Sequence, residues 1–349
     1  MDTEMKRCPS SESSAPGFLP WMRGIGGPAV SGFLLLTALV FGVEAAKTAP
    51  PVQDSTAAGD SALSPRAEAL SDTAATDSPG VSLPDSASPE SGPGLAPGFI
   101  SAPVKEPPFG VGERLRYSME FSVMRAGRSE MSIVGVDSSF GRPAFHFRSR
   151  VKSTRTVDLI YKVRDVIEAW FDVSGLYSWR YDRYVREGGY RSRKFFDYNH
   201  RTGWASVSNE NGPKGVVRFT PFSHNIISAL YWVRCQPLEA GVDLRVPLHD
   251  QSVQYPLTVK VYGIEEVKVP AGTFRCWKVE PVIESEGLFK MAGRLLVWLT
   301  DDDLRIPVMM ASKIPVGSIV GRLVEYRPGA PYHPGDPLPE EVIDDSWDW

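Results

Sequence analysis

Apolar and polar residues alternate along most of the chain between residues 109 and 329. The clearest case runs from Leu115 to Val123, where every second residue is apolar and the residues between are polar or charged. A period of two places the apolar side chains on one face of a β-strand. We therefore predict a half-buried strand here and a second one from Phe145 to Val151. Similar runs predict further strands at 166–173, 176–185, 190–198, 203–208, 214–219, 253–263, 274–283, 293–300, 305–312 and 317–327.

One segment departs from this alternation. Apolar residues recur with helical spacing from Ser223 to Cys235, with Ser223 as the expected N-cap and Pro237 just beyond the end. Turn-forming residues such as Asn211-Gly212-Pro213 separate the strands. The sequence therefore predicts a mainly β protein with a single large, curved antiparallel sheet and one main helix at about 223–235. Such a sheet either closes into a barrel or wraps around the helix as a half-barrel.

The amino-terminal end has the features of an export signal. Residues 28–43 are apolar, Arg23 precedes them, and small residues follow at Ala45 and Ala46. We predict that 1–46 is a signal peptide, although an uncleaved anchor formed by 28–43 remains an alternative. Either interpretation places the bulk of the protein outside the cytoplasm, in the periplasm or cell envelope.

Composition divides the rest of the chain into three parts. Residues 47–108 are rich in Pro, Ser and Ala, and we predict a disordered linker. Residues 330–349 contain six acidic residues and no Lys or Arg, which predicts a disordered acidic tail. The remaining β-rich domain, 109–329, carries 32 Lys and Arg against 24 Asp and Glu, although the whole chain has a net charge of −4.

Most of this positive excess lies in residues 141–201, which hold 14 Lys and Arg against seven acids. The cationic residues are interleaved with Tyr, Trp and Phe, a composition that suits anionic lipids or polymers as well as nucleic acid. Export argues against nucleic acid as a partner. The alternative is a solvated face whose opposite side belongs to the core. The candidate ligand-binding residues are Arg148, Arg150, Tyr181, Arg191 and Arg193.

No catalytic, cofactor or metal motif stands out in the sequence. None of the five histidines forms a pair with metal-ligand spacing, and there is no nucleophile elbow, P-loop or dinucleotide fingerprint. Asp301–Asp303 lies between two predicted strands, where Asp is a common turn residue. We therefore expect no cofactor, no metal site and no enzymatic activity. The alternative is an active site built from distant residues, with His146, His200 or His224 beside a Ser or Asp.

Two cysteines follow the predicted signal, Cys235 at the end of the helix and Cys276 in a strand. Outside the cytoplasm they could form a disulfide that closes a loop of about 40 residues and contributes ~3–4 kcal/mol. Cys276 could equally be a small buried apolar residue. The sequence leaves both alternatives open.

Several short stretches resemble a bacterial family known as domain of unknown function 3108. They are 112–117 (GERLRY), 230–234 (LYWVR), 269–276 (VPAGTFRC), 297–302 (VWLTDD) and 305–308 (RIPV). The resemblance implies an exported, β-rich domain, with no established reaction and no catalytic residues to transfer.

These observations predict an exported, non-enzymatic envelope protein that holds a lipid-like or anionic ligand in a barrel or half-barrel cavity. Two alternatives remain. One is a structural or assembly module that binds another envelope protein, and the other is an envelope hydrolase with a non-local active site.

Overall fold

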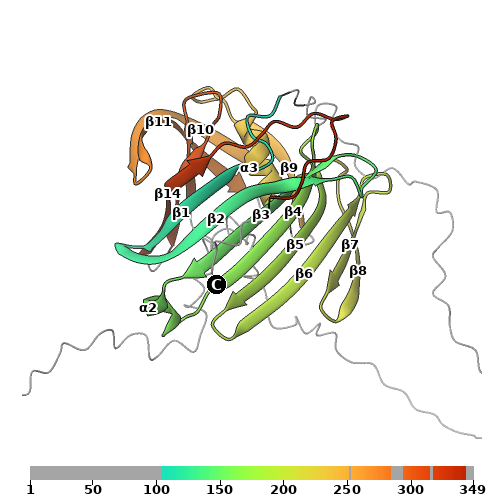
Figure 1. Ribbon diagram of the computed structural model, residues 1–349, viewed down its shortest axis with the longest axis horizontal. Helices are drawn as coiled ribbons and strands as arrows, with labels where there is room; N and C mark the ends of the chain where they lie inside the picture. Colours follow the sequence, from blue (N-terminus) through green and yellow to red (C-terminus); the bar gives the residue numbers. More distant parts are fainter. Residues whose placement is uncertain (1–103, 105, 251–252, 284–293, 315–316, 343–349) are drawn as a thin grey trace, which may run out of the picture. The chain divides into compact units, whose positions relative to one another are not determined.

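The computed structural model describes residue 104 and residues 106–250, 253–283, 294–314 and 317–342. The predicted signal peptide, nearly all of the predicted linker and residues 343–349 lie outside these ranges. Within them, 14 strands form one antiparallel sheet (Figure 1). The strands are β1 (Arg114–Phe121), β2 (Met124–Asp137), β3 (Ala144–Ser153), β4 (Arg164–Asp172), β5 (Ser178–Glu187), β6 (Tyr190–Asn199), β7 (Trp204–Asn209), β8 (Gly212–Arg218), β9 (Leu244–Asp250), β10 (Val253–Val269), β11 (Gly272–Ile283), β12 (Arg294–Thr300), β13 (Pro307–Ile314) and β14 (Gly317–Arg327), and the helices are α2 (Arg155–Asp158) and α3 (Ile226–Arg234).

The strand order shows that the sheet is open. The chain begins in the middle with β1 and adds neighbours outward to β8. It then crosses to the other edge at β9 and returns strand by strand to β14, which pairs with β1. Strands β8 and β9 are the two edges and do not pair with each other in the described residues. The predicted single antiparallel sheet is therefore confirmed, and it takes the half-barrel form rather than the closed one.

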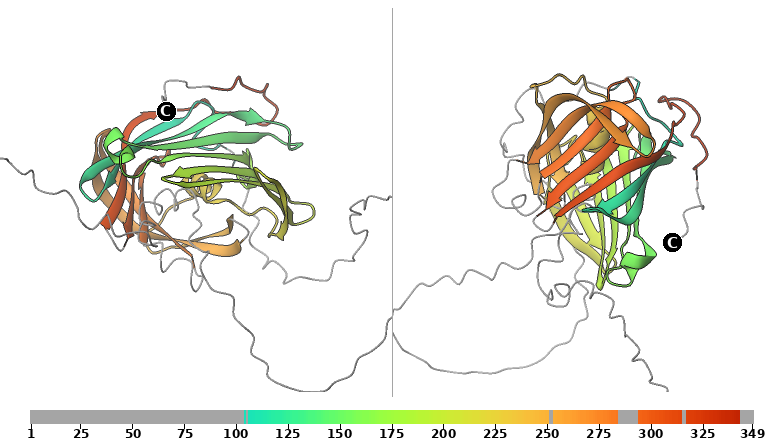
Figure 2. Two further views of the ribbon diagram at one scale, coloured as in Figure 1. Left: turned by 90° about the horizontal axis from the view of Figure 1, so that it is seen from below. Right: turned by 90° about the vertical axis from the view of Figure 1, so that its left-hand side faces the viewer.

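The sheet curves around α3, as the two further views show (Figure 2). On one side, the ring of Tyr231 packs against Phe147 and Phe171, each with ring centroids 5.5 Å apart. On the other side, the helix faces β10–β13. Apolar residues at alternate positions of the strands turn toward the helix and form one buried cluster. None of the helices in the described part of the chain has the length and apolar content needed to span a bilayer.

A short segment before α3 links strands that are far apart in the sheet order. The Ser178 N–H of β5 donates to the Ser223 carbonyl (3.1 Å), and the His224 N–H donates to the Pro247 carbonyl of β9 (2.9 Å). The His249 N–H donates in turn to the His224 carbonyl (2.9 Å). Part of the β9 edge is therefore covered by chain and connected to the opposite half of the sheet.

Two strands, β2 and β9, were not predicted from the sequence. In β2 the alternation is interrupted at a β-bulge between Ile133 and Gly135, so buried residues follow one another instead of alternating. In β9 the reason is Pro247, which lacks a backbone N–H and is tolerated in a strand only where no partner needs that donor. The edge position of β9 satisfies this requirement.

Residues 330–342, the first part of the predicted acidic tail, contact the β-rich domain at both ends. Ala330 pairs with Val111, and Tyr332 is buried. The Val342 N–H donates to the Val134 carbonyl at 2.6 Å. Acidic composition alone did not reveal these contacts, because they depend on backbone groups and on one aromatic side chain.

Candidate functional site

The helix α3 begins at a capping box. The Asn225 side-chain oxygen accepts hydrogen bonds from the Ile227 and Ser228 N–H groups (2.9 and 2.8 Å), and the Ser228 hydroxyl accepts from the Asn225 N–H (3.1 Å). This arrangement satisfies donors that have no partner within the helix. The predicted N-cap, Ser223, is wrong by two residues, and its hydroxyl donates to the Thr220 carbonyl instead (2.6 Å).

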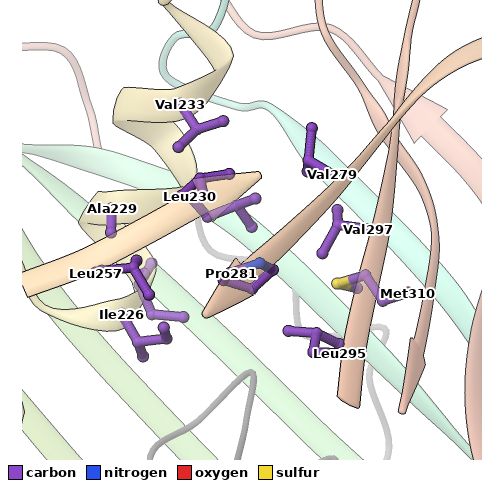
Figure 3. A pocket seen from close by; sticks show the side chains of 12 residues that line it. Ile226, Ala229, Leu230, Val233, Leu257, Val279, Pro281, Leu295, Val297 and Met310 are labelled. Carbon is purple, nitrogen blue, oxygen red and sulfur yellow. The ribbon is translucent and has the colours of Figure 1, made fainter. Parts of the chain in front are cut away.

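Helical periodicity gives α3 two different faces. Ile226, Ala229, Leu230 and Val233 follow the spacing i, i+3, i+4, i+7 and form an apolar stripe. The stripe faces β10–β13 and lines a cleft (Figure 3). Helical spacing in the sequence predicted this helix, and the same spacing contains the stripe, which was not predicted to line a cleft.

The cleft is lined only by apolar side chains. Its volume is about 530 Å³, including the part that is open to solvent. Its enclosed part is about 50 Å³, smaller than the usual small-ligand site, so a ligand here would lie partly in the space that opens to solvent. No lining side chain carries a charge or a hydrogen-bonding group, so the cleft can hold hydrocarbon but cannot supply a nucleophile, a general acid or a metal ligand. The strand residues that line it are Leu257 and Val259 of β10, Val279 and Pro281 of β11, Leu295 and Val297 of β12, and Met310 of β13.

The opposite face of α3 is fixed by a buried ion pair. The two terminal nitrogens of Arg234 donate to the two carboxylate oxygens of Glu113, at 2.9 and 2.7 Å, and both side chains are fully buried. The Tyr231 hydroxyl donates to the same carboxylate (3.2 Å), and Arg234 also donates to the Leu304 carbonyl (3.2 Å). The helix is thus attached to the start of β1, which holds its apolar stripe in place beside the cleft.

The structure does not bring the five candidate ligand-binding residues together. Tyr181 points into the core and is fully buried. Arg148 and Arg150 lie on the outer face of β3, at the positions that alternate with its buried residues. Arg191 and Arg193 lie on the outer face of β6, where both are exposed. The four arginines and Tyr181 therefore occupy opposite sides of the sheet and cannot form one site.

Carboxylates neutralise part of the basic outer face. Arg148 lies 2.8 Å from Glu168, and Arg150 lies 2.5 Å from the buried Glu130. On β5, burial raises the pKa of Asp182 to about 6, against the opposing effect of its ion pair with Arg180. Of these three carboxylates only Glu130 lies outside residues 141–201, so most of the positive excess of that segment remains.

His146 and His200 occupy structural positions. The ring of His146 stacks on Trp170 on the outer face of the sheet, with centroids 4.3 Å apart. His200 uses both ring nitrogens on backbone groups, the Ser178 carbonyl (2.7 Å) and the Phe222 N–H (2.9 Å). Burial lowers the pKa of His200 to about 4, which favours the neutral ring that these two contacts require.

His224 does lie beside a serine, because its Nδ1 is 3.3 Å from the Ser228 hydroxyl. Both side chains are buried beneath α3, and the hydroxyl already takes part in the capping box. Burial lowers the pKa of His224 to about 4. The pair therefore stabilises the start of the helix and has no access to a substrate in the cleft or in solvent.

Cys235 and Cys276 are both free, so the disulfide considered from the sequence is not formed in this structure. Cys235 terminates α3 and its thiol donates to the Tyr231 carbonyl (3.4 Å). Cys276 lies in β11, opposite Thr300 of β12. Burial raises the pKa of each thiol to about 12, which keeps both protonated at neutral pH.

Asp301–Asp303 forms a turn between β12 and β13, as predicted. The Asp302 carboxylate accepts hydrogen bonds from the Thr300 hydroxyl (2.6 Å) and from the Leu304 and Arg305 N–H groups (3.1 Å each). One of its two oxygens, Oδ1, is thereby committed to the turn. Among the described residues, no group of three or more His, Cys, Asp or Glu side chains is arranged to hold a metal ion.

Comparisons with known proteins give a family match and a likeness to a solved structure. The model of a family described as "Protein of unknown function (DUF3108)" matches residues 116–324. Among solved structures, the chain is similar to a beta-barrel-like protein of domain of unknown function DUF1849 from Brucella abortus. The two are 11% identical, with a TM-score of 0.45, and the match covers 64% of this chain and 100% of the other. No curated protein matches this chain.

Proposed function

The chain belongs to the DUF3108 family of proteins of unknown function, and we propose that it is an exported, non-enzymatic envelope protein that binds a lipid-like ligand in the cleft between α3 and β10–β13. The observation that carries this proposal is the lining of the cleft, which consists only of apolar side chains. Each methylene group that leaves water for such a surface contributes about 0.8 kcal/mol. A hydrocarbon chain therefore gains affinity along its length without any polar contact.

The rest of the molecule supports a binding role over catalysis. The histidines closest to hydroxyl or carboxylate groups serve backbone contacts, ring stacking or the cap of α3. The ion pair of Glu113 and Arg234 fixes the helix before any ligand arrives, so little conformational entropy is lost when a ligand enters. Export is supported by the pattern of residues 1–46.

The test is native mass spectrometry of the full chain, recovered after export and purified without strong detergent, followed by solvent extraction. We expect a co-purifying lipid-like mass. The variant Ala229→Leu adds three carbon atoms to the apolar stripe and should reduce the bound fraction by filling the cleft. A fluorescent fatty acid provides an independent probe, which should bind to the natural chain and bind more weakly to Ala229→Leu.

The matched control is Val216→Leu, which enlarges an exposed apolar side chain on the edge strand β8, outside the cleft. This control should retain the ligand mass and the binding of the fatty acid. Identical binding by Ala229→Leu and the natural chain would contradict the assignment to this cleft. A ligand-free mass with no binding of the fatty acid would contradict lipid binding altogether and would favour an assembly role.

A further inference from the structure

Antiparallel pairing brings two connections that follow odd-numbered strands to one rim of the sheet. They are the turn between β1 and β2 and the segment between β3 and β4 that contains α2. The Thr154 N–H donates to the Ala126 carbonyl at 2.8 Å and joins the two. Residues 122–128 and 154–162 therefore form one continuous surface, which we call the α2 rim. Both projections lie side by side in the views of Figures 1 and 2.

The α2 rim carries the three most exposed large apolar side chains of the described residues. Val123 is 99% exposed at the turn, and Leu159 and Ile160 are 87% and 67% exposed directly after α2. Met124, 45% exposed, lies next to them. Single exposed apolar residues are ordinary on a protein surface. Several of them together at the tips of two adjoining loops are unusual. Such a patch is typical of a surface that interacts with another protein or with a membrane.

Cationic side chains surround these apolar tips. Arg125, Arg155 and Lys162 are exposed within the same two segments. The one carboxylate there, Asp158, is engaged by Arg164 through two hydrogen bonds of 3.0 and 2.6 Å. No ion pair involves Arg125 or Arg155 among the residues that the structure describes. Side chains from both segments, Arg125 and Arg155 among them, line one hollow of about 1070 Å³ that is open to solvent. The positive charges of the two segments therefore lie around the same hollow.

We propose that the α2 rim docks on the surface of an anionic lipid bilayer. Val123, Leu159 and Ile160 enter the boundary between head groups and acyl chains, and Arg125, Arg155 and Lys162 contact the lipid phosphates. Apolar tips with adjoining cations are the combination that holds a protein in the interface plane, because insertion and electrostatic attraction add. The outer-face residues Arg191 and Arg193 lack this combination and are not part of the docking surface.

Docking extends the proposed function, because it would bring the cleft close to the bilayer from which a lipid-like ligand would come. Leu295 is the second residue of β12, and Pro281 lies near the end of β11, so the lining of the cleft reaches the same rim of the sheet. From β12 to β2 there are four strand-to-strand steps of about 4.8 Å each, or roughly 19 Å in all. The docking itself does not require a ligand in the cleft.

The experiment is hydrogen–deuterium exchange of the full chain with vesicles of phosphatidylcholine, alone or mixed with phosphatidylglycerol. We expect protection of residues 122–128 and 155–162 with the anionic vesicles and much less with the neutral ones. Added salt should weaken it, because the cations act through screened attraction. Protection that is absent from the rim, or equal on the two kinds of vesicle, would overturn the proposal. Protection by soluble polyglutamate but not by vesicles would replace the membrane with an acidic polypeptide.

Variants test the two components of the surface separately, in the same full-chain background. The double variant Arg125→Gln/Arg155→Gln should bind to anionic vesicles roughly 25-fold more weakly, since each cation near such a surface contributes a factor of about five. Leu159→Ser/Ile160→Ser should lose the insertion. Arg191→Gln/Arg193→Gln and Val216→Ser are the matched controls for charge and for exposed apolar surface, and both should bind as the natural chain does.

The same variants distinguish this inference from the proposed function. Ala229→Leu should lose the cleft ligand and keep the protection of the α2 rim. If rim protection persists in a chain that never carries a ligand, the cleft assignment fails and the docking surface stands. If the ligand is present and the rim is unprotected, the docking surface fails alone.

Discussion

The two faces of α3 show opposite ways of packing a helix against the same curved sheet. Toward β1 and β4, the helix contributes a buried charged and aromatic network in which the Glu113 carboxylate accepts hydrogen bonds from Arg234 and Tyr231. Toward β10–β13, it contributes an apolar stripe whose cleft is not filled by the protein itself. The first face gives the helix one defined position, and the second leaves space that a ligand can use. Stability and binding are thus divided between two sides of one short element.

The largest effect is expected from breaking the network face. Glu113→Gln would leave the guanidinium of Arg234 buried without its counter-charge, which costs about 3–5 kcal/mol of the free energy of unfolding. Denaturant unfolding of the full chain measures this loss. The control is Glu325→Gln, which removes a half-exposed partner of Arg114 and should cost under about 1 kcal/mol. Equal losses in the two variants would show that the buried pair does not anchor the helix.

Acid should also lower the free energy of unfolding through His224, which is buried beside the start of α3. Burial lowers the pKa of this ring from its ordinary value of 6.5 to about 4. The unfolded chain therefore binds the proton first, and stability is complete above pH 6.5 and falls as the pH drops toward 4. At pH 4.5 the loss from this residue alone is about 2–3 kcal/mol. His224→Gln should flatten the pH dependence of the free energy of unfolding by this amount, and parallel curves for the two proteins would contradict the assignment.

A smaller effect is expected at the helix cap. Asn225→Ala removes the acceptor of the Ile227 and Ser228 N–H groups, which should lower the free energy of unfolding by about 1–2 kcal/mol. Asn225→Asp keeps the acceptor oxygen and is the matched comparison, with a smaller expected loss. Ser223→Ala tests the position that the sequence pattern favoured. If its loss exceeds that of Asn225→Ala, the helix begins earlier than the structure indicates.

The smallest effect should come from the cleft face. Extra carbon atoms in a filled core usually cost about 1–3 kcal/mol. Ala229 is buried but lines the cleft, so an added side chain can extend into the cleft, and we expect Ala229→Leu to lower the free energy of unfolding by less than a substitution in the filled core. Ala169→Leu, at a fully buried position of β4 on the opposite side of the helix, should show the larger penalty. Equal penalties would mean that the cleft is closed in solution.

Sequence patterns predicted the sheet better than the site. Regular alternation predicted β1 and β3, whereas the bulge at Gly135 and the proline in β9 concealed two strands. The cleft could not be predicted, because it forms where β10–β13 fold across the apolar stripe of α3. The distance between these strands and the helix cannot be read from the sequence. For the same reason, positive charge along residues 141–201 suggested one surface, although cross-strand register places Tyr181 and the arginines on opposite sides.

The pairing of β1 with β14 has a consequence for the order in which the molecule folds. Most neighbouring strands are also neighbours along the chain, so their hairpins close over short loops, whereas this ladder joins Arg116 to Glu325. Closing so long a loop is entropically costly and slow, so we expect it to come late. A chain that ended before Gly317 would contain two ladders, β1–β8 and β9–β13, without strand pairing between them; only the segment before α3 would bridge them. Strand β14 therefore completes the pairing that joins the two ladders into one sheet.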